Sequence, residues 1–399
     1  MNRILKLIKI SARNIGQNII HNIILIIFVI SSVFFMNISL SSFRHCMYQN
    51  TLVQSSGLYD SYMYAGVPAK QVYYSESGED MYLAADKYVT NELNDIKNSG
   101  VIDNYFSISE TNMMLNNESD MEVRMFFGSS DLLKNISFPV IKGKWFDAYS
   151  GDSLDEEYVP IVIGYNLKSV YNVGQILNLD GVDEKCIVAG ILRSNTLFLH
   201  AGTGGSGIDL NNVMRNSDNI IIVAKEPDGY GNSYIIKLSE GKNAKSEDIV
   251  LGAIADVVDT FSFKNLANQA YQSNLFEIQM QTILAVLALI TCIVGMKCGN
   301  LLSFIKGRKR MAVYFLCGMD RQTSFWVTTL EGIFKLYVPT LFGLYSFYNY
   351  CKKQSFDGFY IDFFNIFFTV VIITIIFAGT LIRTLHIAKN NQELYILQS

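Results

Sequence analysis

The chain contains four runs of about twenty mostly apolar residues, and these runs constrain its fold more than any other feature. A bilayer core about 30 Å thick is crossed by about 20 apolar residues in helical form. One such run could be the core helix of a soluble protein, but four are typical of a membrane protein. Half of the 399 residues are hydrophobic and only 17% are charged, which favours the same class. We therefore predict transmembrane helices at residues 19–40, 276–296, 325–347 and 363–385.

The segment before the first run has its own pattern. In residues 1–18 apolar residues recur at helical spacing, while the basic residues gather on another face. This pattern predicts a cytoplasmic amphipathic helix along the inner leaflet, with a simple continuation of the first span as the alternative. The run at 19–40 is too long for the apolar part of a secretory signal, and no A-x-A-like cleavage site follows it. We interpret it as an uncleaved signal anchor.

Basic residues are concentrated on one predicted side of the membrane. Residues 1–18 carry four basic residues and no acid, and residues 297–324 carry six basic residues against Asp320 alone. By the positive-inside rule both segments are cytoplasmic. The expected topology has both termini inside, including the tail at 386–399. Residues 41–275 and the short loop at 348–362 are expected outside.

The predicted outer domain, residues 41–275, is acidic. It holds 17 of the 32 Lys and Arg residues and 30 of the 36 Asp and Glu residues. This balance excludes nucleic acid as a partner. It is compatible with a cationic ligand, although a solvated acidic face explains it as well.

The outer domain is expected to be α+β. Helical spacing occurs at 82–100, which ends at a plausible glycine C-cap, at 246–258, and at 263–280, which continues into the second span. Short β-branched or aromatic runs bounded by turn residues predict strands at 122–128, 160–164, 186–192, 219–225 and 233–238. The glycine-rich segment 200–209 has no following lysine and is interpreted as a loop rather than a phosphate site.

Known catalytic patterns are missing from the sequence. It has no Walker A, GxSxG or HExxH motif, and its six cysteines form no CxxC pair. We therefore expect neither an enzyme nor a metal or cofactor site in this chain. Cys46 and Cys186 both fall in the outer domain, where they either pair or remain free buried thiols.

Residues 308–334, "RKRMAVYFLCGMDRQTSFWVTTLEGIF", follow the second span with a basic segment, a glycine and a new helix start. The stretch resembles the FtsX-like permease domain of ABC transporters. Arg308 and Lys309 match the basic start, Gly318 the turn, Asp320 the helix N-cap and Glu331 the glutamate of the next span. Two positions depart from the family pattern: Arg310 replaces the usual acid, and Phe315 replaces a basic residue.

A second resemblance covers residues 140–192, which look like the MacB-type extracytoplasmic core domain. The matching features are Gly143 with Phe146, a strand ending at Gly164, an amphipathic helix leading to Gly174, and a strand with Gly190. Each glycine is expected to close a tight turn between packed strands.

Together the resemblances imply one arrangement: four spans, one plus three, around a large α+β extracytoplasmic domain in a bacterial inner or plasma membrane. They imply the permease subunit of an ABC transporter that acts by mechanotransmission. A cytoplasmic ABC ATPase dimer would bind the ATP and Mg²⁺, and a second permease copy or a paralogue would complete the complex. The implied substrate is a peptide, an antibiotic or another amphiphile. Alternatives are FtsX-like signalling to cell-wall hydrolases and a ligand-sensing scaffold without an ATPase.

The resemblance assigns the coupling role to the segment between the second and third spans. The candidate residues are Arg308, Lys309, Arg310, Gly318, Met319, Asp320 and Arg321. The basic ones among them are also expected to contact anionic lipid headgroups. A loop that only sets the topology is the simpler alternative.

Two charged residues interrupt the third run. Glu331 and Lys335 lie one helical turn apart, where an i,i+4 pair facing protein lowers the cost of burying each charge in the membrane. A proton or ion path is the alternative. Pro339 is expected to kink this span, and Gly295-x-x-x-Gly299 to pack helices closely.

Overall fold

The computed structural model describes residues 2–17, 19–66, 81–115, 121–148, 158–201, 210–227, 233–239, 243–254, 258–316, 321–354 and 363–396. The chain forms two compact units. Met1–His45 and Asn274–Ser399 make up one, the helical bundle; Cys46–Ser273 make up the other, the sheet domain.

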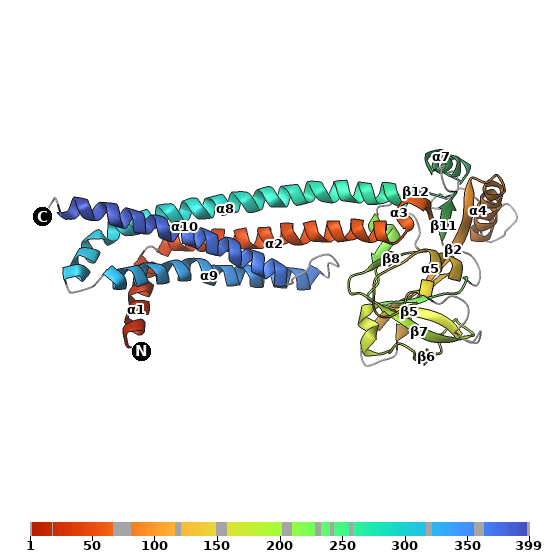
Figure 1. The fold of residues 1–399 in the computed structure, drawn as a ribbon, viewed down its shortest axis with the longest axis horizontal. Helices are drawn as coiled ribbons and strands as arrows, with labels where there is room; N and C mark the ends of the chain where they lie inside the picture. The colour runs from red at the N-terminus through yellow and green to blue at the C-terminus, as the bar shows by residue number, and fades with distance from the viewer. Residues whose placement is uncertain are drawn as a thin grey trace. The chain divides into compact units, whose positions relative to one another are not determined.

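Five helices contribute to the bundle: α1 (Asn2–Gln17), α2 (Ile19–Ser55), α8 (Phe263–Leu316), α9 (Arg321–Gln354) and α10 (Phe363–Ile396). Figure 1 shows α2, α8, α9 and α10 running alongside one another, with α1 at a steep angle to them. The steep angle makes α1 a separate helix rather than a continuation of α2. The Ser11 hydroxyl on α1 donates a hydrogen bond to the Val327 carbonyl on α9 at 3.2 Å.

Two helices of the described residues are long and apolar enough to cross a membrane, Asn22–Ser55 and Phe263–Gly295. They contain most of the first predicted span and all of the second up to Gly295. Phe363–Gly379 is a shorter apolar helix. The third and fourth spans, at 325–347 and 363–385, stay predictions.

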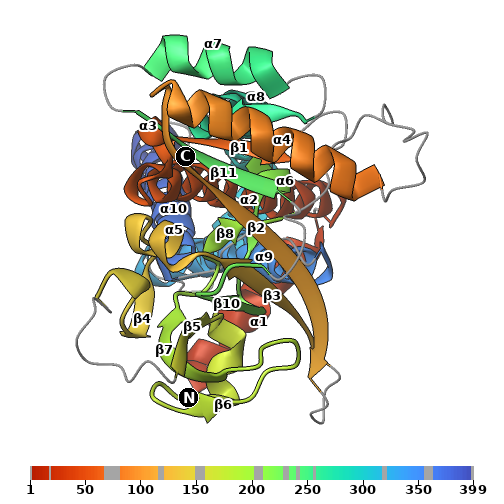
Figure 2. The ribbon, with the colours of Figure 1, turned by 90° about the vertical axis from the view of Figure 1, so that its right-hand side faces the viewer.

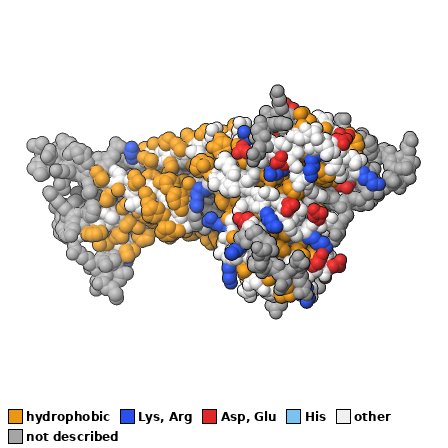
Figure 3. All heavy atoms as spheres, turned by 45° about the vertical axis from the view of Figure 1, so that its right-hand side comes forward, with side chains coloured by type: hydrophobic (Ala, Val, Ile, Leu, Met, Phe, Trp, Pro, Cys, Tyr) orange, Lys and Arg blue, Asp and Glu red, His pale blue; other side chains and the backbone are white. Residues whose placement is uncertain are grey.

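The bundle is apolar inside and outside. Its core consists of Leu25, Val29 and Val33 on α2, with one buried residue from each of α8, α9 and α10 (Cys292, Leu336 and Ile373). Its exterior also carries large apolar side chains, such as Ile20, Leu287, Leu341 and Ile375. Figure 3 shows this hydrophobic covering of the helices. Contiguous apolar surface of this extent is typical of helices that face lipid or other helices.

The sheet domain is built on one mixed ten-stranded sheet. Nine strands follow the order β12-β1-β11-β2-β3-β10-β5-β7-β4, and β6 pairs with β7 off this path. The pairs β3–β10 and β5–β7 are parallel. In sheet order the strands are β12 (Thr260–Ser262), β1 (Tyr62–Gly66), β11 (Ser233–Leu238), β2 (Ile102–Leu115), β3 (Met121–Gly128), β10 (Ile220–Val223), β5 (Tyr158–Ile163), β7 (Lys185–Leu192) and β4 (Val140–Gly143), with β6 at Ile176–Leu177.

Short helices and a hairpin surround this sheet. Strands β8 (Leu197–Leu199) and β9 (Met214–Asn216) form a separate antiparallel pair. The helices are α3 (Leu58–Ser61), α4 (Met81–Asn98), α5 (Ser130–Asn135), α6 (Leu210–Val213) and α7 (Asn243–Ile254), with 3-10 helices η1 (Phe146–Ala148) and η2 (Tyr165–Ser169). In Figure 2, α4 and α7 lie together beside β1 and β11. Their apolar faces form one core cluster with these strands.

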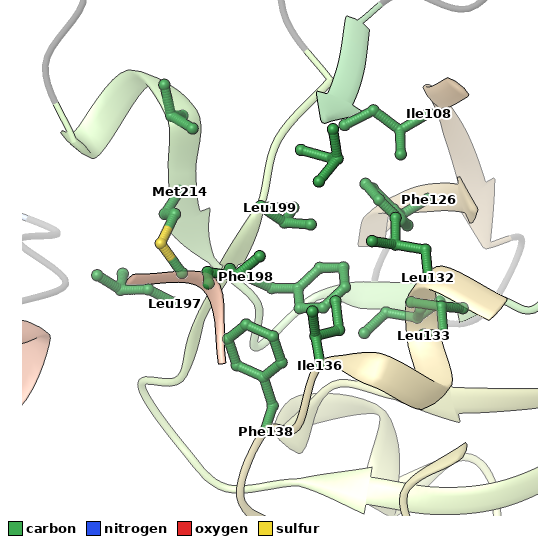
Figure 4. Packing of buried hydrophobic residues seen from close by; sticks show 14 of the residues in the cluster. Ile108, Phe126, Leu132, Leu133, Ile136, Phe138, Leu197, Phe198, Leu199 and Met214 are labelled. Carbon is green, nitrogen blue, oxygen red and sulfur yellow. The ribbon is translucent and has the colours of Figure 1, made fainter. Parts of the chain in front are cut away.

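The core cluster with the most described residues contains several aromatic rings. Phe198 meets Phe126 and Phe138 edge to face, with 4.9 Å between the ring centroids in each pair; Figure 4 shows this packing. Trp145 packs beside them and donates its indole N–H to the Leu133 and Ile136 carbonyls at 2.8 and 2.6 Å. The same cluster includes the end of α2 and the start of α8, through Leu52, Val53, Phe263, Leu266 and Ala267. Both helices are therefore anchored in this core.

Most of the predicted elements are present. All five predicted strands occur, as β3, β5, β7, β10 and β11, and the predicted helices occur as α4, α7 and α8. Gly100 ends α4 with a φ of 73°, as a C-cap glycine does. The amphipathic helix expected before Gly174 is wrong, because the short 3-10 helix η2 takes its place. Cys46 and Cys186 are both buried and form no disulfide, so the disulfide alternative is also wrong. Residues 202–209 of the glycine-rich segment lie outside the described residues.

The four motif glycines are required for two different reasons, a positive φ and a close approach of backbones. Gly174 lies in a turn with a φ of 86°, as expected. Gly143 also has a positive φ, and a Cβ there would lie 2.2 Å from the Ala189 carbonyl oxygen of β7. Gly164 and Gly190 have no positive φ; a Cβ would lie 2.2 Å from the Ser217 oxygen at Gly164 and 2.5 Å from the Lys144 oxygen at Gly190. Close approach of backbones, rather than a turn, explains these two.

We predict that Gly190→Ala destabilises the sheet domain by about 1–3 kcal/mol, because the added methyl group overpacks a contact made by backbone. The measurement is thermal unfolding of the purified chain in detergent, followed by Trp145 fluorescence in a Trp326→Phe background. Gly252→Ala is the matched control, since nothing lies within 4 Å of its Cβ on α7. This control should gain about 0.5–1 kcal/mol from helix formation. Equal stability of both variants would contradict the packing assigned to Gly190.

Candidate functional site

The predicted coupling segment falls at the junction of α8 and α9. The backbone of Arg308, Lys309 and Arg310 belongs to α8, which ends at Leu316, and Arg321 is the first residue of α9. Gly318, Met319 and Asp320 lie outside the described residues, and with them the predicted turn and helix cap. The segment therefore joins the ends of two consecutive helices.

Helix α8 is the longest element of the chain. It runs unbroken over 54 residues, from Phe263 to Leu316. At 1.5 Å per residue this corresponds to a length of about 80 Å. The expectation that the helix at 263–280 continues into the second apolar run is confirmed. A single helix thus connects the core of the sheet domain to the basic segment at 308–310.

The start of α8 is fixed within the sheet domain. The Ser262 hydroxyl accepts the N–H of Asn265 at 3.2 Å, which satisfies one backbone donor of the first turn. Phe263 is fully buried. Tyr59 on α3 donates to the Asn268 side chain at 3.3 Å, and the Lys264 ammonium lies 6.0 Å from the Tyr59 ring centroid. Burial and these polar contacts together hold the first two turns in place.

In the bundle α8 contacts its neighbours along a narrow seam. Its buried apolar residues, Ile278, Ala285 and Cys292, recur every seven positions, as in a coiled coil. A Cβ at Gly295 would lie 3.5 Å from Leu25, an ordinary contact, so Gly295 does not provide the predicted close packing. The close approach occurs instead at Gly343 of α9, where a Cβ would lie 2.9 Å from the Val33 side chain.

Helices α2 and α10 are joined by buried polar side chains. Asn37 donates its amide N–H to Thr369 at 3.0 Å, and Asn365 donates to Ser41 at 2.7 Å. Arg44 donates to the Asn365 amide oxygen at 3.1 Å. These pairs follow one face of α2 for two turns, and we call them the α2–α10 ladder. Sequence analysis missed the ladder, because scattered Asn, Ser and Thr residues in apolar runs do not reveal their partners.

The two charges of the third run lie close together on α9. The Lys335 ammonium and the Glu331 carboxylate lie 4.0 Å apart on α9, with both side chains less than 13% exposed. Helix α9 continues through Pro339 to Gln354. The pair gives each buried charge a counter-charge within one helical turn.

The sheet domain contains a second buried charged cluster, which sequence analysis also missed. The Glu110 carboxylate on β2 accepts from Arg124 on β3 at 2.9 Å and lies 2.8 Å from Nδ1 of His200 after β8. Only 5% of the Glu110 side chain is exposed. Arg124 also donates to the Asn216 carbonyl on β9. The cluster therefore ties both strands of the β8–β9 hairpin to the main sheet.

The electrostatics of Glu110 follow from this geometry. Burial raises the pKa of Glu110, but the hydrogen bond from His200 and the charge of Arg124 outweigh burial and hold the pKa below its ordinary value of 4.5. In the part of the chain that the structure describes, no group of three or more His, Cys, Asp or Glu residues could hold a metal ion. The cluster is thus suited to joining strands rather than to binding a metal.

Comparison with known proteins gives only distant similarity. No protein-family model matches the chain, and no curated protein matches it. Among solved structures, the periplasmic region of MacB from Actinobacillus actinomycetemcomitans is 8% identical with a TM-score of 0.32, over 55% of this chain and 94% of that chain. The extracellular domain of the noncanonic ABC-type transporter YknZ from Gram-positive bacteria is 11% identical with a TM-score of 0.29, over 50% of this chain and 99% of that chain. At TM-scores below 0.5, neither likeness shows the family of this chain.

We predict that Glu110 contributes stability that depends on pH. Its folded pKa is lowered, so its contribution is fully present above the unfolded pKa near 4.5 and is lost as the pH falls through the folded pKa. Glu110→Gln should lower the melting temperature at pH 7, and its difference from the unchanged chain should shrink below about pH 4.5. The difference in melting temperature between the two chains is measured by thermal unfolding at pH values from 3 to 8.

Glu122→Gln is the control, because Glu122 lies exposed on the neighbouring strand. Its melting temperature should follow that of the unchanged chain at every pH. A Glu110→Gln difference that stays constant down to pH 3 would contradict the charge interaction and leave only a packing effect.

Proposed function

We propose that this chain is the permease subunit of an ABC transporter that works by mechanotransmission. The observation that carries the proposal is the continuity of α8 from the sheet-domain core to the basic segment. The FtsX-like and MacB-type patterns in the sequence support it, because they place a coupling element and an extracytoplasmic core domain at the two ends of this helix. The sequence has no nucleotide-binding motif of its own, so the energy comes from a partner.

In this proposal a cytoplasmic ATPase dimer presses on the α8–α9 junction. Arg308, Lys309 and Arg310 contact the ATPase or anionic lipid headgroups, Gly318 and Met319 form the turn, and Asp320 and Arg321 start α9. ATP and Mg²⁺ are held by the ATPase. Because an α-helix pairs its backbone groups internally, α8 carries the push along its axis without exposing backbone to lipid.

The proposal includes the predicted topology. The sheet domain lies outside a bacterial inner or plasma membrane, and both termini lie in the cytoplasm. A second permease copy or a paralogue completes the transport unit, since four helices enclose little space. The substrate is a peptide, an antibiotic or another amphiphile that is expelled from the outer side.

We predict that Arg308→Gln with Lys309→Gln uncouples the complex. Loss of two interfacial charges should lower ATP hydrolysis by the co-purified complex about tenfold, equivalent to about 1.4 kcal/mol. The measurement is ATPase activity of the complex, purified from cells that contain the native partners. The predicted outer loop starts later than expected, because α9 continues to Gln354. Lys352→Gln with Lys353→Gln, at this end of α9 on the predicted outer side, is the matched control and should keep full activity.

The same variants must also keep their topology. In chains whose native cysteines are replaced by serine, an exposed outer-domain cysteine, Asn172→Cys, should react with a membrane-impermeant maleimide in intact cells for all variants. Equal ATPase activity in both glutamine pairs, with unchanged labelling, would contradict the coupling role. Failure of any ATPase to co-purify with the unchanged chain would contradict the transporter assignment itself.

A further inference from the structure

The contacts of α2 differ between the two halves of the bundle. Between Asn37 and Arg44 the helix is held by polar side chains on two sides. The α2–α10 ladder lies on one side, and on the other the Ser39 and Thr282 hydroxyls lie 2.6 Å apart, joining α2 to α8. Thr282 donates to the Ile278 carbonyl of its own helix at 2.7 Å, so it accepts from Ser39.

Towards Leu25 the contacts of α2 with α8 are apolar. Leu25, Val29 and Val33 pack in one cluster with Cys292 of α8, and Leu25 is the nearest neighbour of Gly295. Leu25 and Ser39 lie 14 residues apart on α2, or about 21 Å along its axis. The seam between α2 and α8 therefore has a polar end and an apolar end.

The free-energy cost of separating α8 from α2 differs between these two ends. Lipid tails are as apolar as leucine, so Leu25 and Cys292 can exchange protein contacts for lipid contacts with little loss. Separation at the polar end costs more, because the Ser39 hydroxyl then loses its bond to Thr282, which keeps only its bond to the Ile278 carbonyl. The sheet-domain core also holds the end of α2 and the start of α8 together, through Val53 and Phe263. Hence α8 is fixed at the end near Ser39 and can separate from α2 only at the end near Leu25.

We propose that the Ser39–Thr282 contact is the pivot beyond which α8 curves gently away from α2 without breaking, so that its cytoplasmic part moves away from Leu25 while the α2–α10 ladder stays closed. This inference rests on the proposed function, which supplies the push at the cytoplasmic end of α8. It adds the position of the pivot and the helix that moves. Beyond Thr282 the buried residues of α8, Ala285 and Cys292, are apolar and one heptad apart, so this part of the helix separates without breaking a polar contact.

Pairs of cysteines at three contacts test the pivot. In a chain whose native cysteines are replaced by serine, the apolar end carries Leu25→Cys with Gly295→Cys. The pivot carries Ser39→Cys with Thr282→Cys, and the ladder carries Asn37→Cys with Thr369→Cys. The rate of cross-linking by a short bis-methanethiosulfonate is measured in membranes that contain the native partners, with and without ATP and vanadate.

The pair at the apolar end should cross-link about threefold or more slowly in the trapped state, since the rate follows the fraction of molecules in contact. The other two pairs should cross-link at unchanged rates. Similar changes in all three pairs, or a larger change at the ladder, would overturn the pivot and leave the transporter assignment intact. If no pair responds to nucleotide while each cross-links without it, both the pivot and the push at the α8–α9 junction are wrong.

Discussion

The continuity of α8 is the constraint on which the rest of the structure depends. One helix begins in the aromatic core of the sheet domain at Phe263 and ends beyond the basic segment at Leu316. An α-helix is suited to this task because it leaves no backbone group unpaired as it passes from a protein core into apolar surroundings. Its end near Phe263 is fixed by burial and a serine cap, whereas its contact with α2 towards Leu25 is apolar. Because α8 is continuous and fixed at this end, a displacement of its cytoplasmic end is passed along the helix towards the sheet domain.

Polar side chains decide which parts of the bundle stay together. In water the contacts of Asn37, Ser41 and Asn365 would add little, because each group has water as an alternative partner. Among apolar helices that alternative is missing, so each buried amide or hydroxyl keeps the neighbour it has. The same reasoning applies to Glu331 and Lys335 on α9, where each charge stays near its counter-charge.

Periodicity and turn residues were enough to predict much of the fold. The apolar runs predicted the long helices, and β-branched runs predicted five strands of the sheet, because these signals are local. The strand β2 was missed, since Asn104, Ser107 and Glu110 interrupt its apolar pattern while the sheet still pairs it on both sides. The sequence also did not predict the roles of Gly164 and Gly190 or the partners of Glu110. These features depend on backbones and side chains that meet only in the folded chain.

Every proposal above requires that α8 remains one helix between the sheet domain and the bundle. The most direct measurement is the distance between spin labels at Gln272 and Lys297, two exposed positions of α8 on either side of the boundary between the units. An unbroken helix places them about 38 Å apart along the axis. We expect a single narrow distance distribution near this value, with and without nucleotide. A broad or two-peaked distribution would mean that α8 breaks between these positions and cannot act as one connecting helix.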